Sequence, residues 1–356
     1  MKQVKSISRT SRDNIGTVLM IVVIYVLVQI LNGAGHINNQ MRGLLVPLCV
    51  YATMAVSLNL VVGILGELSL GHAGFMCVGA FASSFFSKLF AETMPVFPRF
   101  LLAILIGGIV AGIFGFLIGI PVLRLNGDYL AIVTLAFGEI IKNIMNVLYV
   151  GRDANGLHFS IKDQMALGLL PDGEIIINGP QGISGTPNDS NFTIGFLILL
   201  VATVVVLNLV NSREGRAIMS IRDNHIAAGS VGIPITKYKM LAFTMSAVIA
   251  GCAGALYSHN LASLMATPAR FGDNMSSLFL VFVVLGGFGS ARGSIIAAIV
   301  LTLIPELLRF MNDYRMLIYS IVLIVMMIVN WNPKSRAWIQ AHFGRKKNAE
   351  AGKEGR

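Results

Sequence analysis

Long apolar runs separated by short polar segments dominate this chain. A membrane-spanning helix needs roughly 20 mainly apolar residues. Runs of about this length predict spans near 15–33, 43–65, 69–90, 100–121, 129–150, 193–211, 240–261, 275–290, 294–311 and 315–332. Glycines interrupt the third and eighth runs, so eight spans with two re-entrant pieces are the alternative. The pattern predicts an all-α integral membrane protein, a polytopic bundle of about ten transmembrane helices with glycine-broken segments.

Composition supports a membrane protein and argues against several other classes. Hydrophobic residues make up 55% of the chain and charged residues 12%, whereas about a quarter of the residues in a soluble domain are charged. The net charge of +10 does not indicate nucleic-acid binding, because the cations lie at the termini and in short loops. Cys49, Cys77 and Cys252 each lie inside an apolar run, which argues against disulfides and metal ligation.

The distribution of Lys and Arg predicts the orientation. With both termini in the cytoplasm, about two thirds of these residues lie on the inner side, as the positive-inside rule requires. The first apolar run resembles a signal peptide, but its length favours an uncleaved span. We expect a cytoplasmic segment at 1–14, a transmembrane domain at 15–335 with an external loop at 151–192 and a cytoplasmic loop at 212–239, and a basic cytoplasmic tail at 336–356.

The polar stretch Ser212–Met240 lies between two apolar runs and carries the signals of folded helices. Ser212 is a predicted N-cap, and Asp223-Asn224 predicts the end of one short helix and the start of a second, which Gly232 terminates. Composition alone favours an ordinary cytoplasmic loop whose charges hold the topology. A docking site for a soluble partner is the alternative.

Glycines break the region Gly63–Gly74, which also contains Ser69, Gly71 and His72. In lipid, irregular backbone survives only where it is buried in protein or lines a wet cavity. A helix that restarts near Gly71 would direct free N–H groups at a bound carboxylate, which makes these three residues candidates for a substrate path. The alternative is a tight cytoplasmic turn, with His72 hydrogen-bonded to a neighbouring helix.

The span that follows Gly127 supplies further candidates. Tyr129 and Thr134 extend the candidate path toward the middle of the membrane. A carboxylate inside a membrane marks function by default, which draws attention to Glu139. Lys142 lies three residues further on, and we favour simple pairing of these two side chains on one helix face.

The external loop is too long to be only a connection, and loops of this length are often functional. Pro171-Asp172-Gly173 predicts a turn between the apolar stretches Leu167–Leu170 and Glu174–Ile177, and therefore a small hairpin. The sequence has no Walker motif, no metal-ligand spacing and no nucleophile motif. If ATP drives transport, another subunit must bind it.

Six segments carry a resemblance to a known family. They are SLNLVVGILGELSLGHAGFMCVGAF at 57–81, GDYLAIVTLAFGEI at 127–140, GPQGISG at 179–185, GRAIMSIRDNHIAAGSVGI at 215–233, TKYKMLAFTMSAVIAGCAGALY at 236–257, and GGFGSARGS at 286–294. Together they resemble the permease subunits of branched-chain amino-acid ABC importers, most closely the longer of the two sister permeases. The resemblance runs in order from about residue 43 to 335.

The resemblance implies a ten-span permease in a heterodimer with a second, related permease subunit. It implies two ATP-binding cassette subunits, which bind ATP and Mg, and a periplasmic or lipid-anchored binding protein that delivers leucine, isoleucine or valine. The chain itself would be no enzyme and would bind no cofactor and no nucleic acid. It would lie among the lipids of the bacterial plasma (inner) membrane.

The resemblance also assigns roles to residues. The loop at 216–232 corresponds to the family's coupling segment, which docks on the ATPases, and its candidate residues are Arg216, Arg222, Asp223, His225, Ala227, Ala228 and Gly232. Docking of the binding protein is expected at Gly179, Pro180, Gln181 and Gly182.

One departure and two alternatives remain. The family usually has an acid before the Ile-Ala-Ala of the coupling segment, and here His225 stands in that place, which puts a fixed negative contact to the ATPase in doubt. Importers of urea or short amides use near-identical permeases. An ion-coupled secondary transporter is the alternative from another class, and it would require paired intramembrane carboxylates.

Overall fold

The computed structural model describes residues 9–35, 38–125, 127–171, 173–308 and 314–331. The chain divides into a larger unit, Met1–Ala298, and a smaller unit, Ile299–Arg356. The expected tail at 336–356 and the first eight residues lie outside the described residues.

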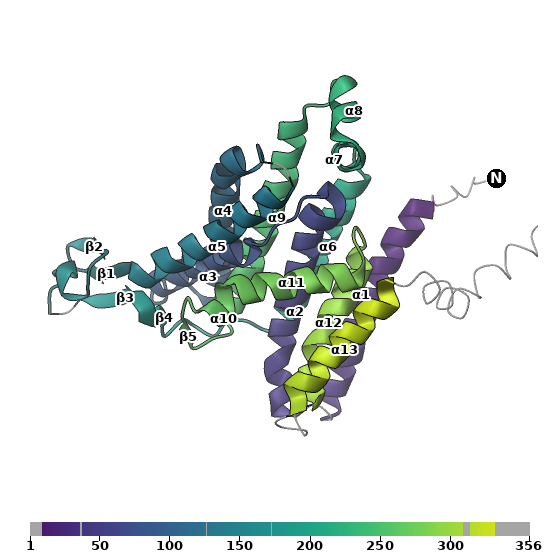
Figure 1. Cartoon of the computed structure of the whole chain (residues 1–356). Helices are drawn as coiled ribbons and strands as arrows, with labels where there is room; N and C mark the ends of the chain where they lie inside the picture. The colour runs from purple at the N-terminus through teal and green to yellow at the C-terminus, as the bar shows by residue number, and fades with distance from the viewer. Residues whose placement is uncertain (1–8, 36–37, 126, 172, 309–313, 332–356) are drawn as a thin grey trace, which may run out of the picture. The chain divides into compact units, whose positions relative to one another are not determined.

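Helices make up most of the described chain (Figure 1). In chain order they are α1 (Arg9–Gly33), α2 (Asn39–Asn59), the π-helix η1 (Leu60–Leu65), α3 (His72–Leu89), α4 (Val96–Val122), α5 (Asp128–Val147), η2 (Met165–Leu167), η3 (Gly179–Gln181), α6 (Phe192–Asn211), α7 (Arg213–Asp223), α8 (His225–Ser230), α9 (Ile235–Ser258), α10 (Pro268–Phe271), α11 (Asp273–Gly286), α12 (Ala291–Leu307) and α13 (Arg315–Trp331).

Seven helical segments among the described residues are long and apolar enough to cross a membrane. They are 14–33, 39–65, 96–122, 128–147, 192–211, 235–258 and 268–286. The predicted count of ten is not confirmed. Helix α3 is not among the seven because His72, Lys88 and several serines reduce its apolar character, and α12 and α13 have only 17 residues each.

The expectation of an all-α fold needs a correction, because short strands occur between α5 and α6 and just after α9. They are β1 (Tyr149–Asp153), β2 (Gly156–Ser160), β3 (Glu174–Asn178), β4 (Ile183–Ser184) and β5 (Ser263–Leu264). A three-stranded sheet has the order β2-β1-β3, and β4 pairs with β5 in a second sheet. The pairing of β4 with β5 connects the end of the loop between α5 and α6 to the chain just after α9.

The predicted hairpin, which joined residues 167–170 to residues 174–177, does not form. The observed hairpin joins β1 to β2, and β3 pairs antiparallel with the other edge of β1. Gly156, with φ of +130°, helps to turn the chain between β1 and β2. Residues 165–167 form a turn of 3₁₀ helix instead of a strand, and Asp172 of the predicted turn lies outside the described residues.

The β1–β2 hairpin is held by one buried carboxylate. The Asp153 side chain accepts hydrogen bonds from the N–H groups of Asn155 and Leu170 and contacts the His158 ring. Burial raises the pKa of Asp153, but these hydrogen bonds outweigh burial and lower it below its usual range. The carboxylate therefore stays ionised at neutral pH and fixes the turn.

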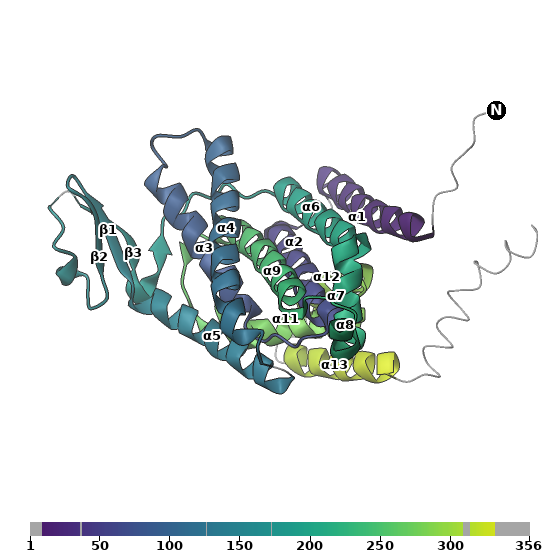
Figure 2. The same cartoon turned by 90° about the horizontal axis from the view of Figure 1, so that it is seen from above.

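The core of the larger unit is a close packing of α3, α4 and α9 through glycines. Figure 2 shows α9 between the α3–α4 pair and α2. A Cβ on Gly79 would lie 2.3 Å from the Gly251 carbonyl oxygen, and a Cβ on Gly251 would lie 2.5 Å from the Gly107 carbonyl oxygen. Small residues of this kind allow membrane helices to approach closely.

Replacing Gly251 with Ala should destabilise the protein by about 1–3 kcal/mol, because the added methyl group would overpack a dense core. The midpoint of thermal unfolding in detergent would measure the loss. Gly43→Ala is the matched control, since a Cβ there meets nothing within 4 Å. Equal midpoints for the two variants would contradict the close packing of α4 and α9.

Candidate functional site

The chain that joins α6 to α9, together with the first five residues of α9, is called the α7–α8 segment (Ser212–Lys239), and it contains two short helices as predicted. The Ser212 hydroxyl accepts a hydrogen bond from the Gly215 N–H at 3.1 Å and caps α7. The Asn224 side chain accepts from the N–H groups of Ile226 and Ala227 and caps α8. Each such cap contributes about 1 kcal/mol, so the segment has a defined conformation.

Glu214 in the first turn of α7 adds to this capping. A hydrogen bond from its own N–H, another from Ser212, and the charges of Arg213 and Lys237 lower the pKa of Glu214 below its usual value. The carboxylate is therefore ionised at neutral pH and interacts favourably with the positive end of the helix dipole.

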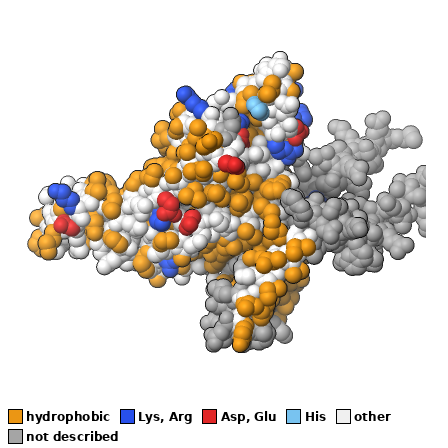
Figure 3. Space-filling model, viewed as in Figure 1, with side chains coloured by type: hydrophobic (Ala, Val, Ile, Leu, Met, Phe, Trp, Pro, Cys, Tyr) orange, Lys and Arg blue, Asp and Glu red, His pale blue; other side chains and the backbone are white. Residues whose placement is uncertain are grey.

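The tip of the α7–α8 segment exposes apolar side chains. Ile226 is 71% exposed and Val231 is 76% exposed, and Ala227 is exposed as well. Ala228 is 4% exposed and packs inward. Figure 3 shows hydrophobic side chains at the α8 end, with Lys and Arg side chains gathered below them. An apolar tip rimmed by charge favours a protein partner.

The other coupling candidates on this segment do not share one surface. Arg216, Asp223 and His225 are exposed, and Gly232, with φ of +85°, turns the chain after α8. Arg222 makes a contact outside the segment: it donates a hydrogen bond to a backbone carbonyl near the start of the glycine-broken region.

The glycine-broken region begins with an irregular helix. Helix α2 continues into η1, and the chain then leaves helical conformation at Gly66, whose φ is +83°. The Arg222 Nη1 atom donates to the Gly63 carbonyl oxygen at 2.9 Å. Lys239 forms an ion pair with Glu67, and their side chains are 7% and 13% exposed. The α7–α8 segment thus holds this region at two points.

His72 is fully buried and hydrogen-bonded to two neighbouring helices, and such bonding is one part of the alternative stated from the sequence. Its Nε2 atom lies 2.8 Å from the Ser57 hydroxyl of α2 and 3.2 Å from the Ser246 hydroxyl of α9. The Ser57 hydroxyl donates to the Ser246 carbonyl oxygen, and the Ser246 hydroxyl donates to the Ser57 carbonyl oxygen. His72 Nδ1 and the Ser69 hydroxyl have no hydrogen-bond partner among the described residues.

The remaining path candidates separate into buried and exposed positions. The Thr134 hydroxyl of α5 accepts from the Leu70 N–H at 3.1 Å. A Cβ on Gly71 would lie 1.8 Å from the Thr134 carbonyl oxygen, so Gly71 is packed directly against α5. The Ala73 N–H at the start of α3 donates to Ser276. Tyr129, in contrast, is 72% exposed, and among the five candidates it alone presents its side chain to a surface.

Ion pairing also accounts for two of the charges on α5. Lys142 pairs with Glu139 at i, i+3, as predicted. Sequence reasoning missed the pair of Lys239 with Glu67, because the two residues lie 172 positions apart. It also missed Asn59, whose side chain accepts from the Gly289 N–H at 2.9 Å. A lone Asn inside an apolar run was the available signal.

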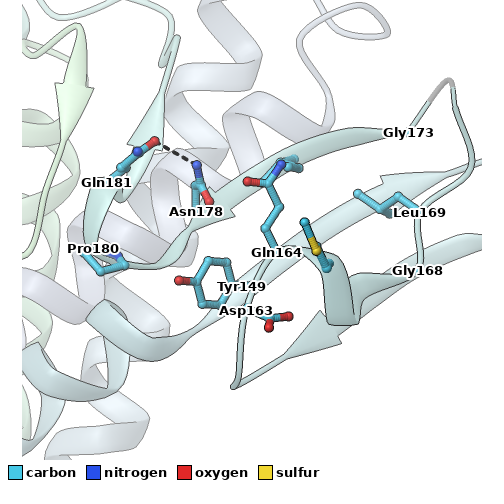
Figure 4. Close-up of a pocket in the computed structure, with 11 residues that line it drawn as sticks. Tyr149, Asp163, Gln164, Gly168, Leu169, Gly173, Asn178, Pro180 and Gln181 are labelled. Atoms are coloured by element: carbon cyan, nitrogen blue, oxygen red, sulfur yellow. Dashed lines mark hydrogen bonds between the residues drawn. The ribbon is translucent and has the colours of Figure 1, made fainter.

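The three-stranded sheet of residues 149–178 carries a pocket of about 960 Å³. Figure 4 shows Tyr149, Asn178 and Gln181 around it, with the Asn178 amide donating to the Gln181 side chain at 2.8 Å. Of the docking candidates, Pro180 and Gln181 are exposed and line this pocket. Gly179 and Gly182 are buried, both with positive φ, and a Cβ on Gly182 would lie 1.9 Å from the Leu264 carbonyl oxygen. The glycines shape the turn that presents the two exposed residues.

The described residues contain no group of three or more His, Cys, Asp or Glu side chains that could hold a metal ion.

Replacing Lys239 with Met should cost about 3–5 kcal/mol of stability, because Glu67 would be left charged and nearly buried without a partner. Thermal unfolding in detergent would measure the loss. Lys237→Met is the control, since Lys237 is exposed on the same helix. The double variant Glu67→Gln, Lys239→Met should recover part of the loss. A Lys239→Met variant as stable as the control would contradict a structural ion pair.

Comparison with known proteins places the chain in a family. The profile described as "Branched-chain amino acid transport system / permease component" matches residues 40–329. The high-affinity branched-chain amino acid transport system permease proteins LivM of Salmonella typhimurium and Escherichia coli are each 34% identical over 295 residues, 80% of this chain and 67% of the relative. The nucleoside ABC transporter permease protein NupC of Lactococcus lactis is 24% identical over 225 residues, 60% of this chain and 65% of the relative.

No solved structure matches the chain. The matched region covers α2 to α13 with few residues left out, and includes the glycine-broken region, the α7–α8 segment and the three-stranded sheet. The chain is therefore an integral membrane protein that belongs to the family of permease components of branched-chain amino acid transport systems.

Proposed function

We propose that this chain is the translocation subunit of an ABC importer that moves leucine, isoleucine and valine across the bacterial plasma membrane. The observation that carries the proposal is the 34% identity to permeases named for branched-chain amino acid transport, over 80% of the chain. The family profile, which matches residues 40–329, includes both the glycine-broken region and the α7–α8 segment. The proposed role is transport, with ATP hydrolysis in other subunits.

The α7–α8 segment is the proposed docking site for two ATP-binding cassette subunits, which bind ATP and Mg. The apolar tip formed by Ile226, Ala227 and Val231 supports this assignment, because it is exposed on a capped, folded segment. His225 lies beside the tip and is exposed, where it would offer a hydrogen bond in place of a fixed negative charge. Both termini would then lie in the cytoplasm, on the same side as this segment.

A second, related permease is the proposed partner across the substrate path. The exposed side chains of α5, with Tyr129 at 72% and Ile132 at 62% exposure, provide a surface that one chain leaves uncovered. The other path candidates would form a buried layer beneath these exposed side chains, since all four are buried: Ser69, Gly71, His72 and Thr134. This chain would bind no cofactor and no nucleic acid.

The pocket beside the β2-β1-β3 sheet is the proposed contact for a periplasmic or lipid-anchored binding protein, which places this sheet on the external side of the membrane. Pro180 and Gln181 are exposed at its rim, and two buried glycines hold the backbone beneath them. Amide and phenol groups from Gln181, Asn178 and Tyr149 offer hydrogen bonds to a partner that binds and then leaves.

Uptake of radiolabelled leucine and urea tests the proposal. The chain would be reconstituted in vesicles with its partner subunits, with and without internal ATP. ATP-dependent leucine uptake is the expected result. Uptake of urea alone would retain the architecture and overturn the substrate, and ATP-independent uptake by this chain alone would favour an ion-coupled secondary transporter.

Replacing Ala227 with Glu should abolish co-purification of the ATPase subunits without blocking membrane insertion, because the charge would lie on the exposed apolar tip. Affinity purification of the chain from membranes would measure both the yield and the bound ATPase. Ala228→Glu is the contrasting variant: Ala228 is 4% exposed, so this substitution should reduce the yield of folded protein. Normal ATPase binding by Ala227→Glu would contradict docking at this tip.

A further inference from the structure

The most informative contacts outside the exposed tip are those that connect the α7–α8 segment to the glycine-broken region. Arg222 divides its guanidinium between two acceptors. Its Nε and Nη2 atoms donate to the Asp223 carboxylate at 3.2 and 3.1 Å, and Nη1 donates to the Gly63 carbonyl oxygen at 2.9 Å. A planar guanidinium can hold both acceptors at once, which an ammonium group cannot do with the same geometry.

The Gly63 carbonyl needs such a donor because the helix ends irregularly there. The N–H groups of Gly66 and Glu67 both donate to the Val61 carbonyl, which leaves Gly63 near a helix end where carbonyls lack partners within the helix. A positively charged donor at a helix C-terminus is favourable both as a hydrogen bond and through the helix dipole.

The fit around this contact depends on two glycines. A Cβ on Gly66 would lie 2.5 Å from the Arg222 Cγ atom, so the stem of Arg222 crosses directly over Gly66. A Cβ on Gly63 would lie 1.9 Å from the Asn59 side-chain oxygen and 2.2 Å from the Gly289 nitrogen. Gly63 is therefore where α7, α2 and the turn before α12 meet.

The region beyond Gly63 is attached to other helices at its far end. The Leu70 N–H donates to Thr134 of α5, and His72 is bonded to Ser57 of α2 and Ser246 of α9. Between these attachments, Glu67 is paired with Lys239. A displacement of the α7–α8 segment would thus act on Gly63 and Glu67 and be passed on to three membrane helices.

We infer that Arg222 and Lys239 are positioning residues that transmit partner-driven movement of the α7–α8 segment to the region Gly63–His72, which changes the substrate path in response. This inference rests on the proposed function, because it requires an ATPase that moves the segment. In this inference Arg222 acts through its contact with Gly63 and does not bind the ATPase.

The test uses the reconstituted complex and compares three variants. Arg222→Gln removes the charged donor. Gly66→Ala changes no charge that the ATPase meets. It displaces the Arg222 stem, because the added Cβ would lie 2.5 Å from Arg222 Cγ, and it strains the backbone at a φ of +83°. Arg213→Gln is the matched control, since Arg213 is exposed at the start of the same helix. Co-purified ATPase, the rate of ATP hydrolysis and leucine uptake are measured for each.

The expected result is a fall of roughly tenfold in leucine transported per ATP hydrolysed for Arg222→Gln and Gly66→Ala, a size typical of coupling between sites. ATPase binding and hydrolysis should stay near the wild-type values, and Arg213→Gln should resemble the wild type. Loss of ATPase binding in Arg222→Gln, or an unchanged transport ratio, would overturn the inference alone. A wild-type complex without ATP-dependent uptake would overturn the proposed function together with it.

Discussion

The structure depends on one constraint: inside a membrane, every backbone N–H and C=O group needs a partner from the protein itself. The chain violates regular helix geometry between η1 and α3, and side chains from distant elements complete the hydrogen bonding there. Arg222 supplies a donor to the Gly63 carbonyl, Thr134 accepts from the Leu70 N–H, and Ser276 accepts from the Ala73 N–H. The break is therefore held by α7, α5 and α11, and it is correctly formed only when these helices are in place.

Two kinds of contact surround this break. Helices α3, α4 and α9 meet through glycines at backbone distance, so they pack as a dense unit that has little room to deform. The region Gly63–His72 is held mainly by hydrogen bonds and the Glu67–Lys239 ion pair. Hydrogen bonds and ion pairs of this kind can be exchanged for others at a modest cost in free energy. Helices that pack with their backbones in direct contact have no such alternative arrangement. The contrast explains why we assign movement to this region and rigidity to the glycine-packed helices.

The sequence was informative wherever the determining interactions are local. The caps at Ser212 and Asn224 and the pair of Glu139 with Lys142 all follow from spacings of a few residues, and the structure confirms each of them. The hairpin failed because the pairing of β3 with β1 depends on a contact across the loop, which the turn at 171–173 does not specify. The Glu67–Lys239 pair joins residues that lie 172 positions apart in the sequence. His72 contacts Ser57 and Ser246, which lie 15 and 174 positions away from it. Such contacts are set by helix packing and leave no periodic signal in one sequence.

The central claim is that the α7–α8 segment is the surface through which partner subunits drive transport. A photo-crosslinking side chain introduced at position 226, which is 71% exposed in the native chain, tests it most directly in membranes that contain the assembled transporter. We expect a crosslinked product between this chain and an ATP-binding subunit, identified by mass spectrometry. Products with lipid alone, or none, from an assembled and transporting complex would contradict the account.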